Sequence, residues 1–245
     1  MDISFSGKRI LVTGGGRGIG REICLTLAKC PQVTVFALSQ GKTHLDSLKA
    51  LAPSVNIVPV DLADHEATRK AVAAILPIHA LVNNAGVAHL ASFLDMEMDA
   101  FDKVFEVNVK AVFNVSQVVA KCMVEQKIAG SIVNVSSQAS QAALQDHAAY
   151  CASKGAVDML SKVMALELGP HNIRVNCVNP TVVLTEMGRL GWSDPVKAGP
   201  MLAKIPLGRF AEVSEVVNAV LFLLSDKASM INGITLPIDG GFLAT

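Results

Sequence analysis

The sequence RILVTGGGRGIG, residues 9–20, leads from an apolar β-branched run through a glycine-rich loop into a helical pattern. Glycines at such a strand-to-helix turn permit positive φ, let the backbone approach a pyrophosphate, and direct a helix N-terminus toward its negative charge. The spacing is Gly-x-x-x-Gly-x-Gly, not Gly-x-Gly-x-x-Gly, and a tight turn that binds nothing is the alternative. The loop indicates a dinucleotide site formed by Gly14, Gly16, Arg17, Gly18, Ile19 and Gly20.

Outward from this loop, apolar runs alternate with helical patterns along the whole chain. The runs are continuous, as in strands that helices cover on both faces, and right-handed crossovers between them build a doubly wound sheet. We predict an α/β, Rossmann-like fold with a seven-stranded parallel sheet and helices on both faces. Strands are expected at residues 9–13, 32–38, 55–60, 79–82, 131–135, 173–178 and 234–238, and helices at 18–29, 43–51, 64–76, 98–126, 150–168 and 213–224.

The 245 residues contain no repeat, linker or low-complexity tract, so one domain spanning residues 1–245 is expected. A glycine cap at Gly169, followed by Pro170, is expected to end the helix at 150–168. Residues 181–211, rich in proline and glycine, form the longest stretch without a predicted element. Such an excursion past the carboxyl end of a strand borders the ligand crevice of an open α/β sheet. We expect it to be the substrate loop.

The composition excludes several classes of function. The formal net charge is zero and Lys and Arg are spread along the chain, so no basic footprint for nucleic acid is present. No apolar stretch approaches the roughly 18 residues that span a bilayer, and the N-terminus lacks a signal peptide, so a cytoplasmic protein is expected. The five cysteines and six histidines are scattered, which predicts neither a disulfide framework nor a metal site.

The end of the second predicted strand bears on the type of nucleotide. A carboxylate there would bind a free ribose 2′-hydroxyl and repel a 2′-phosphate, but this chain has Ser39 and Gln40. With Arg17 in the glycine loop and Lys42 nearby, a 2′-phosphate would meet only donors and positive charge, which favours NADPH/NADP+ over NADH. An Arg17 that is simply solvated is the alternative.

Further cofactor contacts are expected where later strands end on the same edge of the sheet. Asp61 can accept a hydrogen bond from an exocyclic amine. An asparagine at such a position serves either the nucleotide or the backbone. The expected contacts are Asp61 and Leu62 after the third strand, Asn84, Ala85 and Gly86 after the fourth, and Pro180, Val183 and Thr185 after the sixth.

The single tyrosine, Tyr150, precedes Lys154 by four residues at the start of a predicted helix, so a phenol and an ammonium share one helix face. A core tyrosine beside a surface lysine is the ordinary explanation of such a pair. Ser137, thirteen residues earlier at the end of the fifth strand, lies on the same edge and favours a catalytic interpretation. Asn108, in the middle of a long helical pattern, needs a buried partner.

Together, T-G-x-x-x-G-x-G, N-N-A-G, Asn, Ser and Y-x-x-x-K resemble the short-chain dehydrogenase/reductase family in order and spacing, over essentially the whole chain. The resemblance implies the strand order 3-2-1-4-5-6-7 and a homotetramer assembled through the helices at 98–126 and 150–168. These helices carry apolar residues on more than one face, among them Val112, Val115, Val157 and Val163, as an interface requires. The implied catalytic tetrad is Asn108, Ser137, Tyr150 and Lys154.

The chemistry of carbonyl reduction agrees with that tetrad. Negative charge builds on the substrate oxygen, so a hydrogen-bond donor and a proton source must lie there, and Ser137 and Tyr150 supply them. The pKa of a free tyrosine, near 10, must fall toward neutrality for proton exchange, and the Lys154 ammonium and an oxidised nicotinamide favour the phenolate. Lys154 is also expected to hold the nicotinamide ribose, and Asn108 to place a water that connects Lys154 with solvent.

Within the family, residues 133–138, 162–171, 179–183 and 205–208 are most similar to a subgroup that reduces L-xylulose to xylitol, and small α-dicarbonyls such as diacetyl, with NADPH. The chain departs from the expected pattern at Gln40, where an arginine would bind the 2′-phosphate, and at Thr181, where glycine is commoner. Trp192 is expected to act as a lid, or else to pack on a neighbouring subunit. The expected substrate contacts are Ser137, Gln138, His147, Tyr150 and Trp192.

Three other functions stay open at this point. The chain is compatible with another sugar or steroid reductase of the family. A 3-oxoacyl carrier protein reductase would need a basic patch at the mouth of the site, where the chain offers only dispersed basic residues. An NADP(H)-binding scaffold without turnover would not need the complete tetrad.

Overall fold

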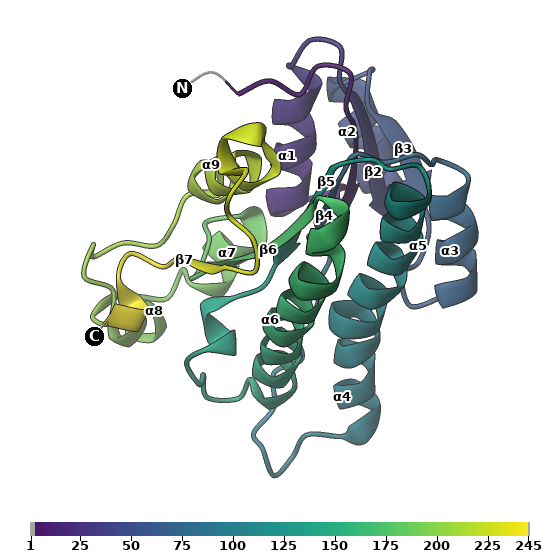
Figure 1. Ribbon diagram of the computed structural model, residues 1–245. Coiled ribbons are helices and arrows are strands. Elements are labelled where there is room, and N and C mark those ends of the chain that lie inside the picture. The colour runs from purple at the N-terminus through teal and green to yellow at the C-terminus, as the bar shows by residue number, and fades with distance from the viewer. Residues whose placement is uncertain (1–2, 245) are drawn as a thin grey trace.

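The computed structural model describes residues 3–244, and its sheet has seven parallel strands in the order β3-β2-β1-β4-β5-β6-β7 (Figure 1). This order confirms the predicted fold class. Because β1 lies between β2 and β4, the strand order reverses there and opens a crevice at the carboxyl edge. The strands are β1 (Arg9–Thr13), β2 (Thr34–Ser39), β3 (Asn56–Pro59), β4 (Ala80–Asn83), β5 (Gly130–Val135), β6 (Ile173–Pro180) and β7 (Thr235–Ile238).

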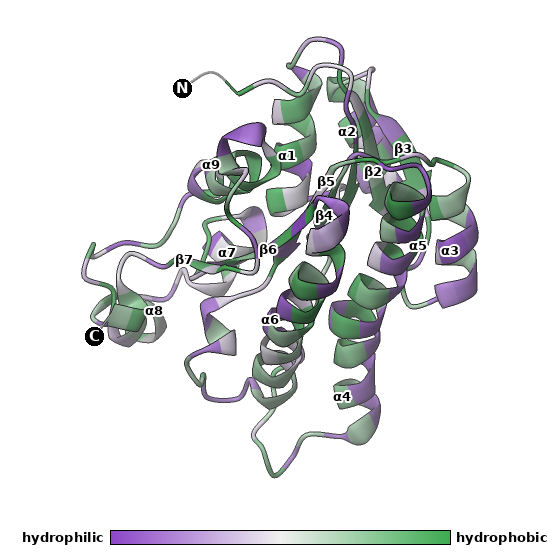
Figure 2. Ribbon diagram, viewed as in Figure 1, coloured by the Kyte–Doolittle hydropathy of each residue, from purple (hydrophilic) through white to green (hydrophobic). Residues whose placement is uncertain are grey.

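Helices cover both faces of the sheet through two separate aliphatic clusters. One cluster joins the sheet to α1 (Gly18–Ala28), α2 (Lys42–Leu51) and α9 (Val213–Leu224). The other joins it to α3 (His65–Ala73), α5 (Ala111–Glu125) and α6 (Ala148–Leu168). Figure 2 shows hydrophobic strands between helices such as α3, whose outer face is hydrophilic. The strands are thus buried on both faces, as their continuous apolar runs predict.

The predicted helix at residues 98–126 is interrupted. α4 (Met98–Phe105) passes into a π-helical turn at Glu106–Lys110 before α5 begins at Ala111. Such π turns are rare and frequently lie at functional sites, and this one contains Asn108. Apolar periodicity did not predict the turn, because the pattern across residues 98–126 predicts one continuous helix.

One further expectation about local structure is wrong and another is confirmed. Residues 181–211 contain two short helices, α7 (Glu186–Gly191) and α8 (Pro195–Leu202), whose prolines and glycines hid them in the sequence. Helix α6 ends at Leu168 with Gly169 as its cap, as expected, and Gly169 keeps a right-handed conformation, with φ of −53°, as it opens a 3-10 turn. Asn172, with φ of 58°, takes the left-handed conformation and turns the chain into β6.

Candidate active site

Ser137, Tyr150 and Lys154 come together at the carboxyl edge of the sheet. Tyr150 is the third residue of α6, and the side chain of Ser137, two residues beyond β5, lies close enough to its phenol to influence the phenol's pKa. Lys154, one turn further along α6 and 4% exposed, donates from Nζ to the Val135 carbonyl oxygen at 2.9 Å. Lys154 Nζ lies 5.6 Å from the centre of the Tyr150 ring. Ser136 instead lies beneath α6, where its Oγ donates to the Lys154 carbonyl oxygen at 3.2 Å.

Asn108 ties the segment after β4 to α6. It is buried in the π turn, its Oδ1 accepts from Val87 N at 2.8 Å, and its Nδ2 donates to Val87 O at 2.9 Å and to Ser153 Oγ at 3.0 Å. Both Nδ2 protons are used within the protein, so only Oδ1 is left for the expected contact with water. A Cβ on Gly86 would lie 3.4 Å from both Asn108 Oδ1 and Lys154 Nζ. Glycine at this position therefore leaves space beside the ammonium.

Burial governs the ionisation of the phenol and the ammonium. It raises the pKa of Tyr150, an effect that the Ser137 side chain partly offsets and Cys151 reinforces. It also lowers the pKa of Lys154 to about 8, against the opposing influence of Cys177 and Asp158. Among the protein's own groups the loss of water contact dominates, and the lowering expected from Lys154 together with an oxidised nicotinamide stays a prediction. The phenol is therefore protonated at neutral pH.

The glycine loop after β1 is packed too closely for side chains at Gly14, Gly15 and Gly20. Gly14 has a φ of +65°, and a Cβ there would lie 2.9 Å from Ala85 Cα. A Cβ on Gly20 would lie 2.4 Å from Gly14 O. Asn84 Nδ2 holds the loop by donating to the carbonyl oxygens of Thr13 and Gly14 at 3.0 and 3.3 Å. A backbone-lined turn at the start of α1 fits a pyrophosphate, and Asn84 serves the backbone.

Ser39 and Gln40 lie at the end of β2, beside the glycine loop. A Cβ on Gly16 would lie 3.4 Å from Ser39 Oγ, so the two segments adjoin. Gln40 Nε2 donates to Asp61 Oδ2 at 2.8 Å, and Asp61 Oδ1 accepts from Ala63 N at 3.0 Å. Both oxygens of the carboxylate thus already have donors, a pairing that the sequence did not predict.

Three other residues of the predicted cofactor site differ in their exposure. Arg17, immediately before α1, is exposed. Ile19 is partly buried against the cluster that joins the sheet to α1 and α9. Leu62 is 7% exposed and belongs to the opposite cluster, so a ligand would meet its backbone rather than its side chain.

The segment after β6 lies over the glycine loop. Pro180 ends β6, Val183 forms an isolated bridge with Ala211, and Thr185 caps α7 by accepting a hydrogen bond from Gly188 N at 3.0 Å. A Cβ on Gly18 would lie 3.4 Å from Thr185 Cγ2. These contacts bring residues 181–185 to the edge where the glycine loop is exposed.

Gln138 is the predicted substrate residue with the most informative surroundings. It is 1% exposed, yet neither Nε2 nor Oε1 has a hydrogen-bond partner. The Oγ1 atom of Thr181, which the prediction did not include, is likewise buried and unpartnered. The β5–β6 register pairs Val135 with Val178, and Gln138 and Thr181 each lie three residues beyond that pair. Buried polar groups are normally satisfied, and the unsatisfied atoms of these two residues make them candidates for contact with a polar ligand.

His147 and Trp192 flank the site in different ways. The His147 ring lies edge-on to that of Tyr150, with centroids 6.2 Å apart, and its Nδ1 is 2.5 Å from Gln145 O. Trp192 packs edge-on against Phe210, with centroids 5.5 Å apart, in a small cluster that also includes Ala142. Trp192 therefore packs within its own chain and links residues 181–211 to the segment between Ser137 and Tyr150.

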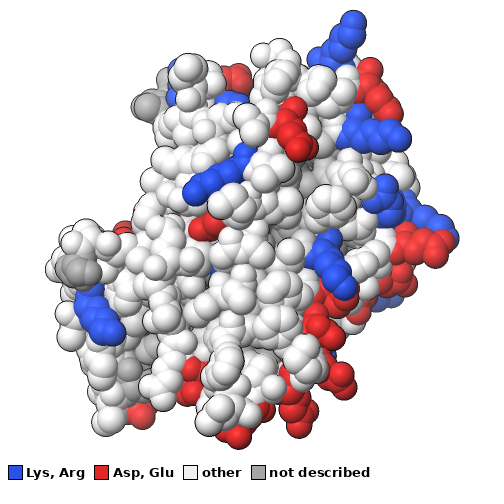
Figure 3. All heavy atoms as spheres, turned by 60° about the horizontal axis from the view of Figure 1, so that its bottom comes forward, with Lys and Arg blue, Asp and Glu red and all other residues white. Residues whose placement is uncertain are grey.

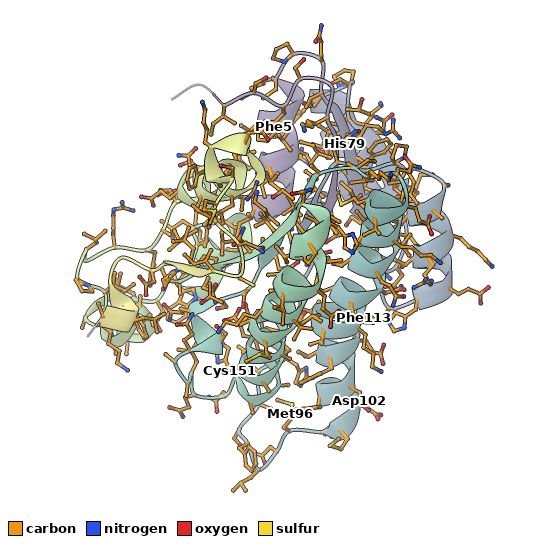
Figure 4. The ribbon with its side chains drawn as sticks, in the orientation of Figure 1. Phe5, His79, Met96, Asp102, Phe113 and Cys151 are labelled. Carbon is orange, nitrogen blue, oxygen red and sulfur yellow. The ribbon has the colours of Figure 1, made fainter. Side chains whose placement is uncertain are left out.

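The surface and the remaining cavities are consistent with one candidate site at this edge. Figure 4 places Cys151 here and Phe5 and His79 at the opposite edge, where a cavity of about 580 Å³ opens that contains none of the predicted residues. On the face drawn in Figure 3, Lys and Arg are scattered and form no basic patch. Within residues 3–244, no group of His, Cys, Asp and Glu is arranged to hold a metal, and no helix has the length and hydropathy to cross a membrane.

Comparisons with known proteins agree with this geometry. A family model described as enoyl-(acyl carrier protein) reductase matches residues 14–243. The chain is 57% identical to L-xylulose reductase of Mesocricetus auratus over the full length of both, and 56% identical to D-erythrulose reductase of Gallus gallus over 100% of this chain and 99% of that one. A gluconate 5-dehydrogenase from Burkholderia cenocepacia, solved with NADP and tartrate, is 32% identical with a TM-score of 0.92, covering 99% and 97% of the two chains. The chain belongs to the short-chain dehydrogenase/reductase family and is an oxidoreductase.

Proposed function

We propose that this protein is an NADPH-dependent carbonyl reductase that reduces L-xylulose to xylitol, and small α-dicarbonyls such as diacetyl, with Tyr150 as the proton donor. The convergence of Ser137, Tyr150 and Lys154 at the carboxyl edge of the sheet, with the Lys154 ammonium beside the Tyr150 ring, carries the proposal. The full-length similarity to L-xylulose reductases supports the choice of substrate.

NADPH, when bound, supplies the hydride. Ser137 Oγ holds the substrate oxygen by a hydrogen bond, and Tyr150 gives its proton to that oxygen as negative charge develops. The raised pKa of Tyr150 suits this direction, because burial keeps the phenol protonated at neutral pH. Lys154 binds the nicotinamide ribose next to the space beside Gly86, and Asn108 holds that segment in place.

The residues at the end of β2 favour a 2′-phosphate. The Asp61 carboxylate is paired with Gln40, and donors from Gln40 and Ala63 already occupy both of its oxygens. Arg17 and Lys42 are exposed and add positive charge. A 2′-phosphate at this place would therefore meet more hydrogen-bond donors and positive charge than repulsive negative charge. Gly14, Gly16, Gly18 and Gly20, with the backbone of residues 61–62, 84–86 and 180–185, form the rest of the proposed nucleotide site.

Gln138 and Thr181 favour a hydroxylated substrate. Substrate hydroxyls would satisfy their buried polar atoms, and a substrate without hydroxyls would leave those atoms unpaired at a cost. Trp192 closes over the ligand as a lid, and His147 lies at the entrance. Residues 181–211 form the substrate loop of a single domain spanning 1–245.

We also propose a cytoplasmic homotetramer. Three of the expected interface residues, Val112, Val115 and Val157, are buried within the subunit, so the expectation that they lie at an interface is wrong. Val163 is 43% exposed, and the other large apolar side chains described as exposed at residues 98–126 and 150–168 are Met98, Phe113, Met159 and Leu166 (Figure 4 labels Phe113).

NADPH oxidation at 340 nm with L-xylulose, D-erythrulose and diacetyl tests the function. We expect turnover of all three, with a higher kcat/KM for the hydroxylated ketoses, and weaker activity when NADH replaces NADPH. No oxidation with any of them, or a clear preference for NADH, would contradict the proposal. A steroid and a 3-oxoacyl thioester in the same panel test the alternative reductases.

A further inference from the structure

A buried carboxylate lies directly beneath the reacting groups, and the proposed mechanism does not use it. Asp158 is 8% exposed and follows Lys154 by four residues, so the two share one face of α6. Its carboxylate accepts from Asn179 Nδ2, at 3.2 Å for Oδ1 and 2.9 Å for Oδ2, and Ser140 Oγ donates to Oδ2 at 2.6 Å. Over the described part of the chain, Asp158 forms no salt bridge within 4 Å. The signal in the sequence is the four-residue repeat Tyr150, Lys154, Asp158.

The partners of Asp158 also hold the turn that carries Ser137. Asn179 Nδ2 lies 3.2 Å from the Ser137 carbonyl oxygen, and Ser140 Oγ lies 2.8 Å from the same atom. Ser137 and Ser140 bound the 3-10 turn at residues 138–140, which also contains Gln138. One carboxylate on α6 thus orients donors from β6 and from this turn.

The negative charge of Asp158 also acts on Lys154. The titratable groups that face Lys154 are Tyr150 and Asp158 from α6 and Cys177 from β6, and the remaining contacts are with neutral groups such as the Val135 carbonyl. Burial lowers the pKa of Lys154 to about 8, and Asp158 opposes that effect. Without this charge, the pKa of Lys154 would be lower still, and a larger part of the Lys154 population would be neutral at physiological pH.

We propose that Asp158 is a positioning residue, whose carboxylate fixes the Ser137–Ser140 turn and keeps Lys154 an ammonium ion. The consequence of Asp158 for catalysis rests on the proposed function, whereas the effect of Asp158 on the ionisation of Lys154 does not. A buried aspartate with a purely structural role would stabilise the fold and leave the ionisation of Lys154 unchanged.

Two variants separate the charge from the hydrogen bonds. Asp158→Asn keeps the shape and removes the charge, and Ser140→Ala removes one hydrogen bond and keeps the charge. We would measure kcat/KM with L-xylulose and the Kd of NADPH, by its fluorescence, from pH 6 to pH 10. Because Asp158→Asn removes a negative charge that favours the protonated form of Lys154, it is expected to move the alkaline limb of both profiles to lower pH. Ser140→Ala is expected to lower kcat several-fold without moving either limb.

Coincident alkaline limbs for Asp158→Asn and the wild type, or an equal shift in Ser140→Ala, would overturn the proposal. Thermal melting identifies a variant that fails to fold, in which case Asp158→Ser, neutral and with room for a water molecule, replaces Asp158→Asn. If both neutral variants fail to fold while Ser140→Ala is fully active, Asp158 is structural and the proposal is wrong. A wild-type protein that binds NADPH but reduces no carbonyl would refute the proposed function, and the pH dependence of NADPH binding would still test Asp158.

Discussion

Lys154→Met should make the protein more stable at neutral pH while removing its activity. The side chain is 4% exposed, and burial lowers its pKa from 10.5 to about 8. At 1.36 kcal/mol per pKa unit, holding the buried group charged costs about 3 kcal/mol below pH 8. Methionine avoids that cost but loses the hydrogen bond to the Val135 carbonyl oxygen, about 1 kcal/mol. We therefore expect a net gain of about 2 kcal/mol at pH 7.

The pH dependence distinguishes this explanation from better packing. Between pH 8 and pH 10.5 the folded wild type loses the Lys154 proton before the unfolded chain does, so the cost disappears as pH rises. The advantage of the methionine variant should therefore fall by about 2–3 kcal/mol between pH 7 and pH 10. Urea unfolding of both proteins, followed by the fluorescence of Trp192, measures the difference between their free energies of unfolding. The contributions of the other titrating groups cancel in this difference. A stability difference that does not change with pH would refute the reasoning.

Three further predictions concern the two ends of the ligand site and the assembly. Gln40→Arg should release Asp61 from its partner and add a charge-assisted hydrogen bond to the 2′-phosphate, so the Kd of NADPH should fall roughly tenfold or more while the Kd of NADH stays unchanged. Equal changes in the two Kd values, measured by calorimetry, would contradict this prediction. Gln138→Leu should raise the melting temperature, because it removes two buried unpartnered atoms, and it should raise the KM for L-xylulose roughly tenfold more than the KM for diacetyl. Equal changes of the two KM values in steady-state assays would argue against a hydroxyl-binding role for Gln138. Leu166→Glu, at a side chain 78% exposed on α6, should reduce the mass found by light scattering from a tetramer to a smaller species, and a wild type that is monomeric at micromolar concentration would contradict the assembly.

Much of the fold could be predicted because its signals are local. The glycine loop follows an apolar run at Arg9–Thr13, where prediction and structure coincide, and helix α9 coincides as well. The π turn around Asn108 and the helices α7 and α8 could not be predicted. A π turn of five residues is too short to have a periodic signal of its own, and the same holds for α7, with its two glycines, and for α8, with its glycine and prolines.

The candidate site was only partly predictable, because several of its properties depend on burial and on contacts distant in sequence. Motif spacing brought Ser137, Tyr150 and Lys154 into one hypothesis. The direction of the Tyr150 pKa shift depends on how completely α6 and the turn after β5 exclude water, and no motif encodes that. The pairing of Gln40 with Asp61 joins residues 21 positions apart and follows from the β2–β3 register.

Tyr150→Phe tests the central claim most directly. The substitution removes the single phenol of the chain and keeps the ring. Loss of a general acid costs roughly 100- to 10,000-fold in rate, so kcat/KM for NADPH-dependent reduction of L-xylulose should fall by that factor while the Kd of NADPH stays within about twofold. A Tyr150→Phe protein that keeps near-normal kcat/KM would contradict the assignment of Tyr150 as the proton donor.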